Sequence, residues 1–233
     1  LAREASWTPI QVFSVLAVMI VGLCIVMYGP NIDQDADAEV ASSADLPVGL
    51  IWVIGAIVFI AFLAESSTEG WSALHIERTL GGGAGEGALG PAFLGLTMGI
   101  GRLSGHVLTR YFSDLVLIAL ACLLSAIGIA IAAGASTVLM AYVGFAFGGL
   151  GISIVAPTAL ALIGRAVPGK LRTIAISRAT VIGYCAFFMG PSLMGFVSEW
   201  FSLATSFFTI AVLLVIVAAI LIPMLSVKLR NHA

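Results

Sequence analysis

The chain has 233 residues, of which 61% are hydrophobic and only 9% are charged. A soluble domain carries about 25% charged residues, so this composition excludes a water-soluble globular protein and indicates an integral membrane protein. The net charge of −2 gives no indication of nucleic-acid binding. The three cysteines lie singly within apolar runs, without the paired spacing of a zinc or redox motif. We therefore expect no metal site and no cofactor.

Seven apolar stretches have about the 20 residues that a helix needs to cross a bilayer. They predict an all-α integral membrane protein with seven transmembrane helices, at residues 8–28, 46–64, 89–109, 114–133, 137–163, 173–198 and 203–225. Trp7 and Tyr28 flank the first stretch, as aromatic residues do at a membrane interface. Short connections at 134–136 and 199–202 require neighbouring helices to be antiparallel.

An acidic segment, residues 31–45, separates the first predicted helix from the other six. It contains five acidic residues and no basic or aromatic one, which is typical of a solvated linker. A cation-binding tail is the alternative interpretation. The predicted organisation is a transmembrane helix at 1–30, a cytoplasmic linker at 31–45 and a six-helix bundle at 46–233.

Basic residues are distributed unequally between the two sides of the predicted bundle. Only Arg3 and Arg78 lie on one side. The other side carries eight, counting those at helix ends: Arg102, Arg110, Arg165, Lys170, Arg172, Arg178, Lys228 and Arg230. Because basic residues are retained in the cytoplasm, we expect a multi-pass protein of the cytoplasmic (inner) membrane with a cytoplasmic C-terminus.

Small residues and prolines interrupt two of the predicted helices. Gly148 belongs to a GxxxG pattern, which lets two helices approach closely in lipid. Pro157, Gly190 and Pro191 fall within the fifth and sixth of the seven predicted helices, where a proline leaves a carbonyl group unpaired. Helices that bend during transport and static kinks explain this pattern equally well.

Several runs resemble the major facilitator superfamily of transporters. Gly-Arg-Leu-Ser-Gly-His-Val-Leu-Thr-Arg at 101–110 resembles the second-half copy of its signature loop, between helices 8 and 9. Gly183-Tyr184, Gly190-Pro191 and Gly195 resemble its helix 11. Ala64–Ser72 and Gly151–Pro157 are similar to bacterial sugar permeases related to the fucose permeases.

The resemblance implies that residues 46–233 are helices 7 to 12 of the superfamily fold. Residues 1–30 then correspond to helix 6, and the acidic linker corresponds to the central cytoplasmic loop. The chain begins with Leu rather than Met, and we expect an N-terminal half to be missing from it.

A gating loop is implied at Gly101, Arg102, Gly105, His106 and Arg110. The superfamily usually has Asp at the position of His106. Neutral histidine keeps hydrogen bonding but lacks the negative charge, so the gating contact is expected to be weaker here. A simple interfacial polar residue and a pH sensor are the two interpretations of His106, and the first is favoured.

Candidate residues for substrate binding and proton coupling are Glu65, Glu69, Trp71 and Tyr184. Glu65 and Glu69 are four residues apart and share one face if the helix continues. A carboxylate that faces a cavity with little water takes up a proton readily, whereas one at the water interface only solvates a helix end. Trp71 is the best candidate for stacking on a sugar ring by the resemblance, with Tyr184 as a further candidate.

Four further polar residues are weaker site candidates. His75, Glu77 and Arg78 are expected in an external loop, and their spacing does not favour a metal site. Arg178 has the position either of an anion-binding residue or of an arginine at a helix end that reaches the interface, and the second is favoured.

The function expected from these residues is secondary active transport by alternating access. The solute is small and polar, with a sugar as the first candidate, and the coupling ion is the proton. No P-loop and no hydrolase or protease motif is present, so we do not expect an enzyme. A non-transporting membrane sensor or scaffold is the alternative.

Overall fold

The computed structural model describes residues 14, 15, 17–19, 21, 22 and 46–232. The chain divides into two compact units, Leu1–Val40 and Ala41–Ala233. In the first unit the described residues are helical, in agreement with part of the predicted first span. The rest of that span and the linker at 31–45 lie outside the described residues.

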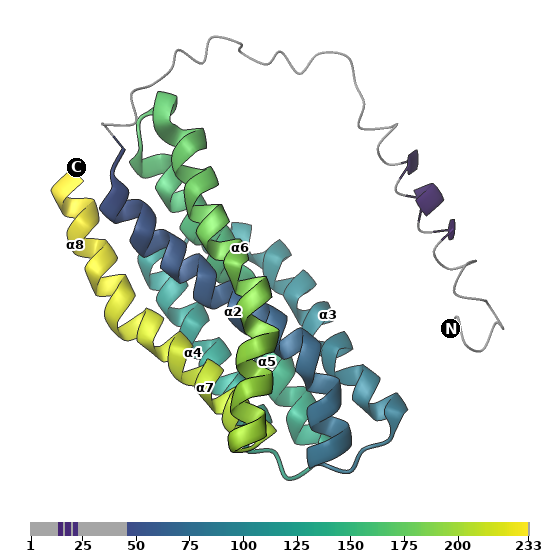
Figure 1. The fold of residues 1–233 in the computed structure, drawn as a ribbon. Coiled ribbons are helices and arrows are strands. Elements are labelled where there is room, and N and C mark those ends of the chain that lie inside the picture. Colours follow the sequence, from purple (N-terminus) through teal and green to yellow (C-terminus); the bar gives the residue numbers. More distant parts are fainter. Residues whose placement is uncertain (1–13, 16, 20, 23–45, 233) are drawn as a thin grey trace. The chain divides into compact units, whose positions relative to one another are not determined.

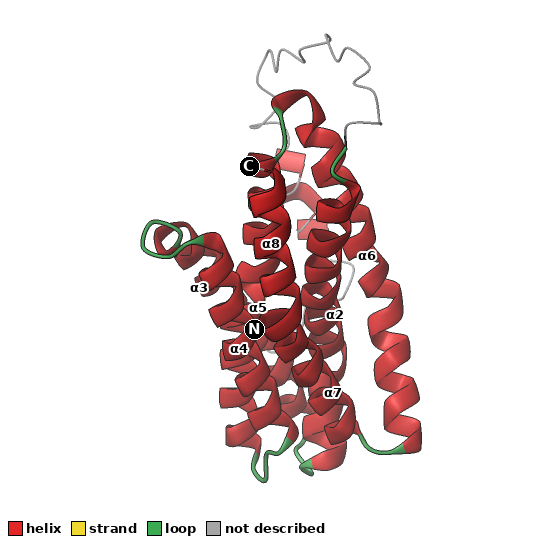
Figure 2. Ribbon diagram, turned by 90° about the vertical axis from the view of Figure 1, so that its left-hand side faces the viewer, coloured by secondary structure: helices red, strands yellow, loops and turns green. Residues whose placement is uncertain are grey.

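The second unit is built from helices alone within residues 46–232, as Figures 1 and 2 show. Its elements are α2 (Val48–Thr79), α3 (Ala84–Leu108), α4 (Asp114–Ala133), α5 (Val138–Ala166), α6 (Gly169–Trp200), α7 (Leu203–Ile216), a π-helical turn η2 (Val217–Leu221) and α8 (Ile222–His232). The last three form one continuous helix. The prediction of an all-α fold is confirmed.

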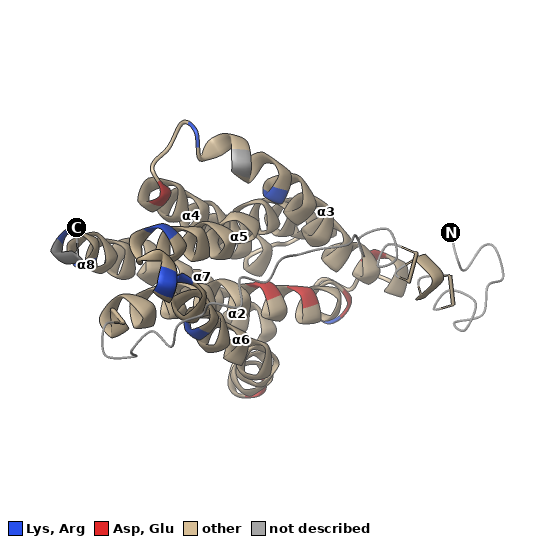
Figure 3. Cartoon of the chain, turned by 90° about the horizontal axis from the view of Figure 1, so that it is seen from above, with Lys and Arg blue, Asp and Glu red and all other residues tan. Residues whose placement is uncertain are grey.

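Five of the described helices are long and apolar enough to cross a membrane: α2, α4, α5, α6 and the continuous helix Leu203–Arg230. The helix α3 is not among them although it has 25 residues. Its many glycines, together with Glu86 and Arg102, make it less apolar than its neighbours. Charged residues are few along the helices, as Figure 3 shows.

The helix α2 is longer than predicted. It was expected to end at Ala64, but it continues for fifteen more residues to Thr79, because no strong helix breaker occurs before residues 81–83. Gly81 then takes a positive φ of 72°, which glycine adopts without strain. His75, Glu77 and Arg78 therefore belong to α2, and their prediction as an external loop is wrong.

The gating loop that the resemblance implies at 101–110 lies mostly within a helix, in agreement with the helix predicted at 89–109. Residues 101–108 form the last two turns of α3, which begins at Ala84 rather than Leu89. Only the residues from Thr109 to Ser113 form the connection to α4. Gly101 and Gly105 do not end α3, because isolated glycines are tolerated within membrane helices.

The six helices alternate in direction, so their connections lie at two ends of the bundle. The predicted outer end carries the connections at 80–83, 134–137 and 201–202. The predicted cytoplasmic end carries those at 109–113 and 167–168, together with the start of α2 and the end of α8. At the predicted outer end, Thr137 and Ser202 cap α5 and α7 by accepting a hydrogen bond from a backbone N–H group.

Glycines bring the helix backbones into direct contact. A Cβ atom on Gly128 of α4 would lie 2.4 Å from the backbone nitrogen of Gly148 and 2.7 Å from the carbonyl oxygen of Gly144, both on α5. The GxxxG pattern of α5 thus faces a glycine on α4. Since helices in lipid gain little from apolar burial, such close packing holds them together.

We expect Gly128→Ala to destabilise the protein, because the added methyl group has no space between α4 and α5. The loss should be about 1–3 kcal/mol, as for other overpacked positions. Thermal unfolding of the full-length protein in detergent measures it. Gly95→Ala on α3 is the matched control, because a Cβ atom there meets nothing within 4 Å and helix propensity should rise. Equal unfolding temperatures for the two variants would contradict this packing.

Candidate functional site

A cavity of about 430 Å³ lies among α2, α3, α5 and α6. It contains two charged side chains, Glu65 and Arg102, and one polar aromatic, Tyr184. Its full lining is Phe62, Glu65, Arg102, Ile152, Ser153, Ala156, Pro157, Leu160, Tyr184 and Phe187. We call it the central cavity. Two of the four candidates for coupling and solute binding, Glu65 and Tyr184, meet in it.

An ion pair joins Glu65 of α2 to Arg102 of α3. The guanidinium nitrogen Nη2 donates a hydrogen bond of 3.1 Å to Oε1 of Glu65. The Glu65 side chain is 17% exposed and that of Arg102 is 55% exposed. The carboxylate is thus largely covered by protein, while the guanidinium group remains accessible from the open side of the cavity.

Glu65 lies deep within the bundle. It is about 20–25 Å from either end of α2 at a rise of about 1.5 Å per residue. A charge at such depth in a membrane is unfavourable, and such residues are usually paired and functional. Glu65 therefore does not solvate the end of a helix, which was the alternative interpretation of this residue.

Three aromatic rings form one wall of the central cavity. The ring centroids of Phe62 and Tyr184 are 5.3 Å apart, those of Phe62 and Phe187 are 5.4 Å apart, and those of Tyr184 and Phe187 are 5.8 Å apart. Tyr184 and Phe187 on α6 are exposed, and Phe62 on α2 is half-buried. An exposed aromatic wall beside a carboxylate and a guanidinium group can bind a polar solute through its apolar face and its hydroxyl or charged groups together.

The other two candidates lie elsewhere on α2. Glu69 is exposed and does not line the central cavity. Trp71 is half-buried and packs on α6, where a Cβ atom on Gly195 would lie 3.7 Å from its ring. Both positions follow from the helical continuation of α2, since successive residues turn by about 100°.

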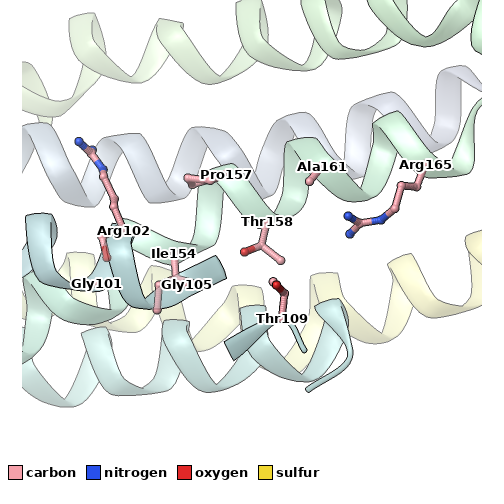
Figure 4. Close-up of a pocket in the computed structure, with 10 residues that line it drawn as sticks. Gly101, Arg102, Gly105, Thr109, Ile154, Pro157, Thr158, Ala161 and Arg165 are labelled. Atoms are coloured by element: carbon pink, nitrogen blue, oxygen red, sulfur yellow. The ribbon is translucent and has the colours of Figure 1, made fainter. Parts of the chain in front are cut away.

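A groove of about 410 Å³ adjoins the central cavity between α3 and α5. Gly101 and Gly105 line it, with Thr109 and Thr158 in its middle and Arg165 toward the predicted cytoplasmic end (Figure 4). Arg102, Ser153 and Pro157 border both spaces. Four predicted gating and kink residues, Gly101, Arg102, Gly105 and Pro157, therefore lie together along this groove.

A second ion pair joins Arg165 of α5 to Asp114 of α4 at the predicted cytoplasmic end. Asp114 lies in the first turn of α4 and Arg165 in the last turn of α5, so each charge also interacts favourably with the dipole of its own helix. Because the arginine side chain is 58% exposed, such a pair contributes at most about 1 kcal/mol. Because the pair joins the ends of two adjacent helices, it favours a structural role in the packing of α4 on α5.

The remaining predicted residues are separated. Arg110 lies in the α3–α4 connection, and His106 is in the last turn of α3, where its side chain is outside the described part. Gly148 packs on Ile129 of α4, and Gly190 packs on α2, where a Cβ atom would lie 2.4 Å from Oγ of Ser66. Pro191 lies next to this contact and is exposed.

The sequence did not indicate that Glu65 and Arg102 are partners. The sequence places Arg102 at the cytoplasmic end of a helix, in the implied gating loop, whereas it lies inside α3 and contacts the middle of α2. Opposite charges within two adjacent apolar spans were the signal that could have identified the pair. Phe62 was also missed, because one aromatic residue in an apolar run carries no specific signal.

Among residues 46–232 and the few described near the N-terminus, no group of three His, Cys, Asp or Glu side chains could hold a metal ion. The two charged side chains that line the central cavity, Glu65 and Arg102, are paired with each other.

Comparison with known proteins agrees with this architecture. The profile of the Major Facilitator Superfamily matches residues 54–232. An uncharacterized MFS-type transporter of Yersinia pestis is 33% identical over 175 residues, which cover 74% of this chain and 45% of the relative. An uncharacterized transporter of Sinorhizobium fredii is 27% identical over 228 residues, which cover 94% of this chain and 58% of the relative.

The chain spans about half the length of the curated relatives it matches. The family profile covers most of the chain, from the first half of α2 to the end of α8. The all-helical bundle and its five helices of membrane-spanning length and composition agree with this match. The chain therefore belongs to the Major Facilitator Superfamily, as a multi-pass membrane protein.

Proposed function

We propose that the full-length protein is a secondary active transporter, which carries a small polar solute together with a proton by alternating access. The observation that carries the proposal is the Glu65–Arg102 ion pair in the middle of the bundle. It places a protonatable carboxylate and a cationic group in one cavity. The relatives named as transporters support transport in general.

The ion pair suggests how proton and solute are coupled. When Glu65 is ionised, its charge holds the guanidinium group of Arg102. Protonation of Glu65 removes this attraction, and Arg102 is then available to a hydroxyl or anionic group of the solute. Release of the solute restores the pair and returns the proton. In each state the guanidinium group of Arg102 therefore keeps a hydrogen-bond partner, either Glu65 or the solute.

The open side of the central cavity supports a site that other parts of the protein complete. Pro157, Tyr184 and Phe187 line the cavity and are exposed in this chain. Transporters of this type bind solute between two repeats. A further part of the full-length protein, in keeping with the greater length of the relatives, is the proposed partner that covers these residues.

A sugar remains the first candidate for the solute, because the aromatic wall can stack on a sugar ring. Tyr184 is the proposed stacking residue, with Phe62 and Phe187 beside it. Trp71 is a weaker candidate, since it packs on α6.

The proposed location is the cytoplasmic membrane, with the C-terminus in the cytoplasm. Basic residues still gather at the predicted cytoplasmic end of the bundle: Arg110, Arg165, Lys170, Arg172, Lys228 and Arg230. At the other end Arg78 is the basic residue within the described part of the chain. This asymmetry supports the orientation through the positive-inside rule.

We expect Glu65→Gln to abolish proton-driven accumulation of solute and to preserve solute exchange, which needs no proton release. The measurement is uptake by proteoliposomes that contain the full-length protein, with a panel of labelled sugars, polyols and amino acids under an imposed proton gradient. Glu69→Gln is the matched control, since this carboxylate is exposed outside the cavity.

Two outcomes of this experiment would contradict the proposal. If the wild-type protein accumulates none of the solutes, symport is contradicted, and a sensor or scaffold becomes the better hypothesis. If Glu65→Gln retains accumulation with unchanged pH dependence, Glu65 is not the coupling residue.

We also expect the two members of the ion pair to be energetically coupled. Glu65→Gln, Arg102→Gln and the double variant should show a coupling energy of about 1 kcal/mol, at the lower end for contacting residues because Arg102 is exposed. Thermal unfolding of the full-length protein measures it. The Asp114–Arg165 pair is the control for transport. Asp114→Asn combined with Arg165→Gln removes this ion pair outside the central cavity and should leave solute uptake unchanged. A coupling energy of zero for Glu65 and Arg102 would show that they do not interact in the membrane.

A further inference from the structure

A buried polar stripe follows Glu65 along α2 toward the predicted outer end. Thr68, Ser72 and His75 are all 0% exposed. Oγ1 of Thr68, Oγ of Ser72 and Nδ1 of His75 have no hydrogen-bond partner among the described residues. More than nine in ten buried polar groups in proteins are paired. Oγ of Ser67 is a fourth unpaired atom, but it lies on the face of α2 toward α6. The other three share one stripe and point to a ligand that pairs them.

The spacing of these residues fits water. Residues three and four apart on a helix lie on one face, with Cβ atoms about 5–6 Å apart. Thr68 and Ser72 are four apart, and Ser72 and His75 are three apart. One water molecule with two hydrogen bonds of about 2.8 Å spans a gap of up to about 5.6 Å, which is in the range of these Cβ separations. Glu65 precedes Thr68 by three residues on the same face, so the stripe begins at the carboxylate.

His75 is the last residue of the stripe, and a hydrogen bond fixes the orientation of its ring. Its Nε2 lies 3.0 Å from the carbonyl oxygen of Ala132 in the last turn of α4. A carbonyl oxygen only accepts, so Nε2 carries the hydrogen and Nδ1 of the neutral ring is an acceptor. The rings of Phe145 and Phe207 contact the imidazole edge-on, with centroids 6.4 and 5.2 Å away. Nδ1 is thus directed to a donor that water can supply.

The surroundings of the stripe are uncharged except at Glu65. The groups of α4, α5 and α7 that contact His75 are a backbone carbonyl and two phenyl rings. From α3, Gly90 covers Ser72, where a Cβ atom would lie 3.2 Å from Cβ of Ser72. Near Glu65 the charged groups are Arg102 of α3 and Glu69 of α2. Water is the small ligand that fits a polar stripe without charge.

We propose that Thr68, Ser72 and His75 hold a file of water molecules, which conducts protons between Glu65 and the predicted outer end of the bundle. His75 lies about 6 Å from the end of α2 and about 15 Å from Glu65. The outermost water of the file donates a hydrogen bond to Nδ1 of His75, which orients it. This water accepts a proton on its oxygen from the outer side and passes its other proton to the next water. Each water and hydroxyl accepts one proton and donates another, until an O–H bond forms at Glu65. The proton route rests on the proposed function, whereas the bound water does not.

The water file is tested directly by a structure of the full-length protein at a resolution that shows ordered water. We expect water within about 3 Å of Thr68 Oγ1, Ser72 Oγ and His75 Nδ1. A stripe without water at these atoms overturns the proposal.

The proton route is tested by infrared difference spectroscopy on the full-length protein in proteoliposomes after an external pH jump. Glu65→Gln identifies the carboxyl band of Glu65. We expect Ser72→Ala and Thr68→Val to slow its protonation about tenfold, which corresponds to about 1.4 kcal/mol of added barrier. The matched control is Ser67→Ala. Ser67 is equally buried on α2 but lies on the face toward α6, where a Cβ atom on Gly190 would be 3.1 Å from its Oγ.

The outcomes separate the two proposals. If the Glu65 band in the wild-type protein does not respond to pH, the proposed function and the proton route are both overturned. The bound water molecules are then tested by the structure of the full-length protein alone. If the band responds and Ser72→Ala is as fast as Ser67→Ala, the route is overturned while the role of Glu65 stands. Unchanged thermal unfolding of Ser72→Ala excludes a folding defect as the cause of slow protonation.

Discussion

Contact between helix backbones at glycine is the constraint on which the rest of the bundle depends. Lipid gives little apolar driving force for association, so dispersion contacts at short range must hold the helices. The residues that flank the ion pair show the consequence. A Cβ atom on Gly101 would lie 2.7 Å from the carbonyl oxygen of Leu150, and one on Gly190 would meet Ser66. Through these contacts α3 packs on α5 next to Arg102, and α6 packs on α2 next to Glu65.

The polar groups of the bundle are arranged along α2. Its middle carries Glu65, whose charge is balanced by Arg102, and its second half carries Thr68, Ser72 and His75. The first half is apolar and packs on α6. One helix thus combines a packing segment with a polar segment, and the transition between them occurs at the depth of the central cavity.

The sequence predicted the fold well and the site only in part. Helix number, α4 and α5 followed from apolar length, and the family followed from Gly and Arg motifs. The end of α2 was missed, since Glu65-Ser-Ser-Thr-Glu69 has the composition of a membrane exit, while its burial depends on neighbouring helices. Arg102 was misplaced for the same reason. Hydropathy measures the transfer of a side chain from water to lipid. It carries no information about the neighbouring side chain of opposite charge that makes a charged residue tolerable within a bundle.

The π-helical turn η2 has a consequence for the last helix. Its hydrogen bond from Ile222 N–H to the carbonyl of Val217 accommodates one residue more than an α-helical turn. Each residue of an α-helix turns by about 100°, so this extra residue rotates everything after it by that amount. Leu225 is thereby fully buried, and Lys228 lies over Gly49 at the start of α2. The final helix thus switches its contact face midway, and removing one residue from η2 would turn its cytoplasmic half out of register with the bundle.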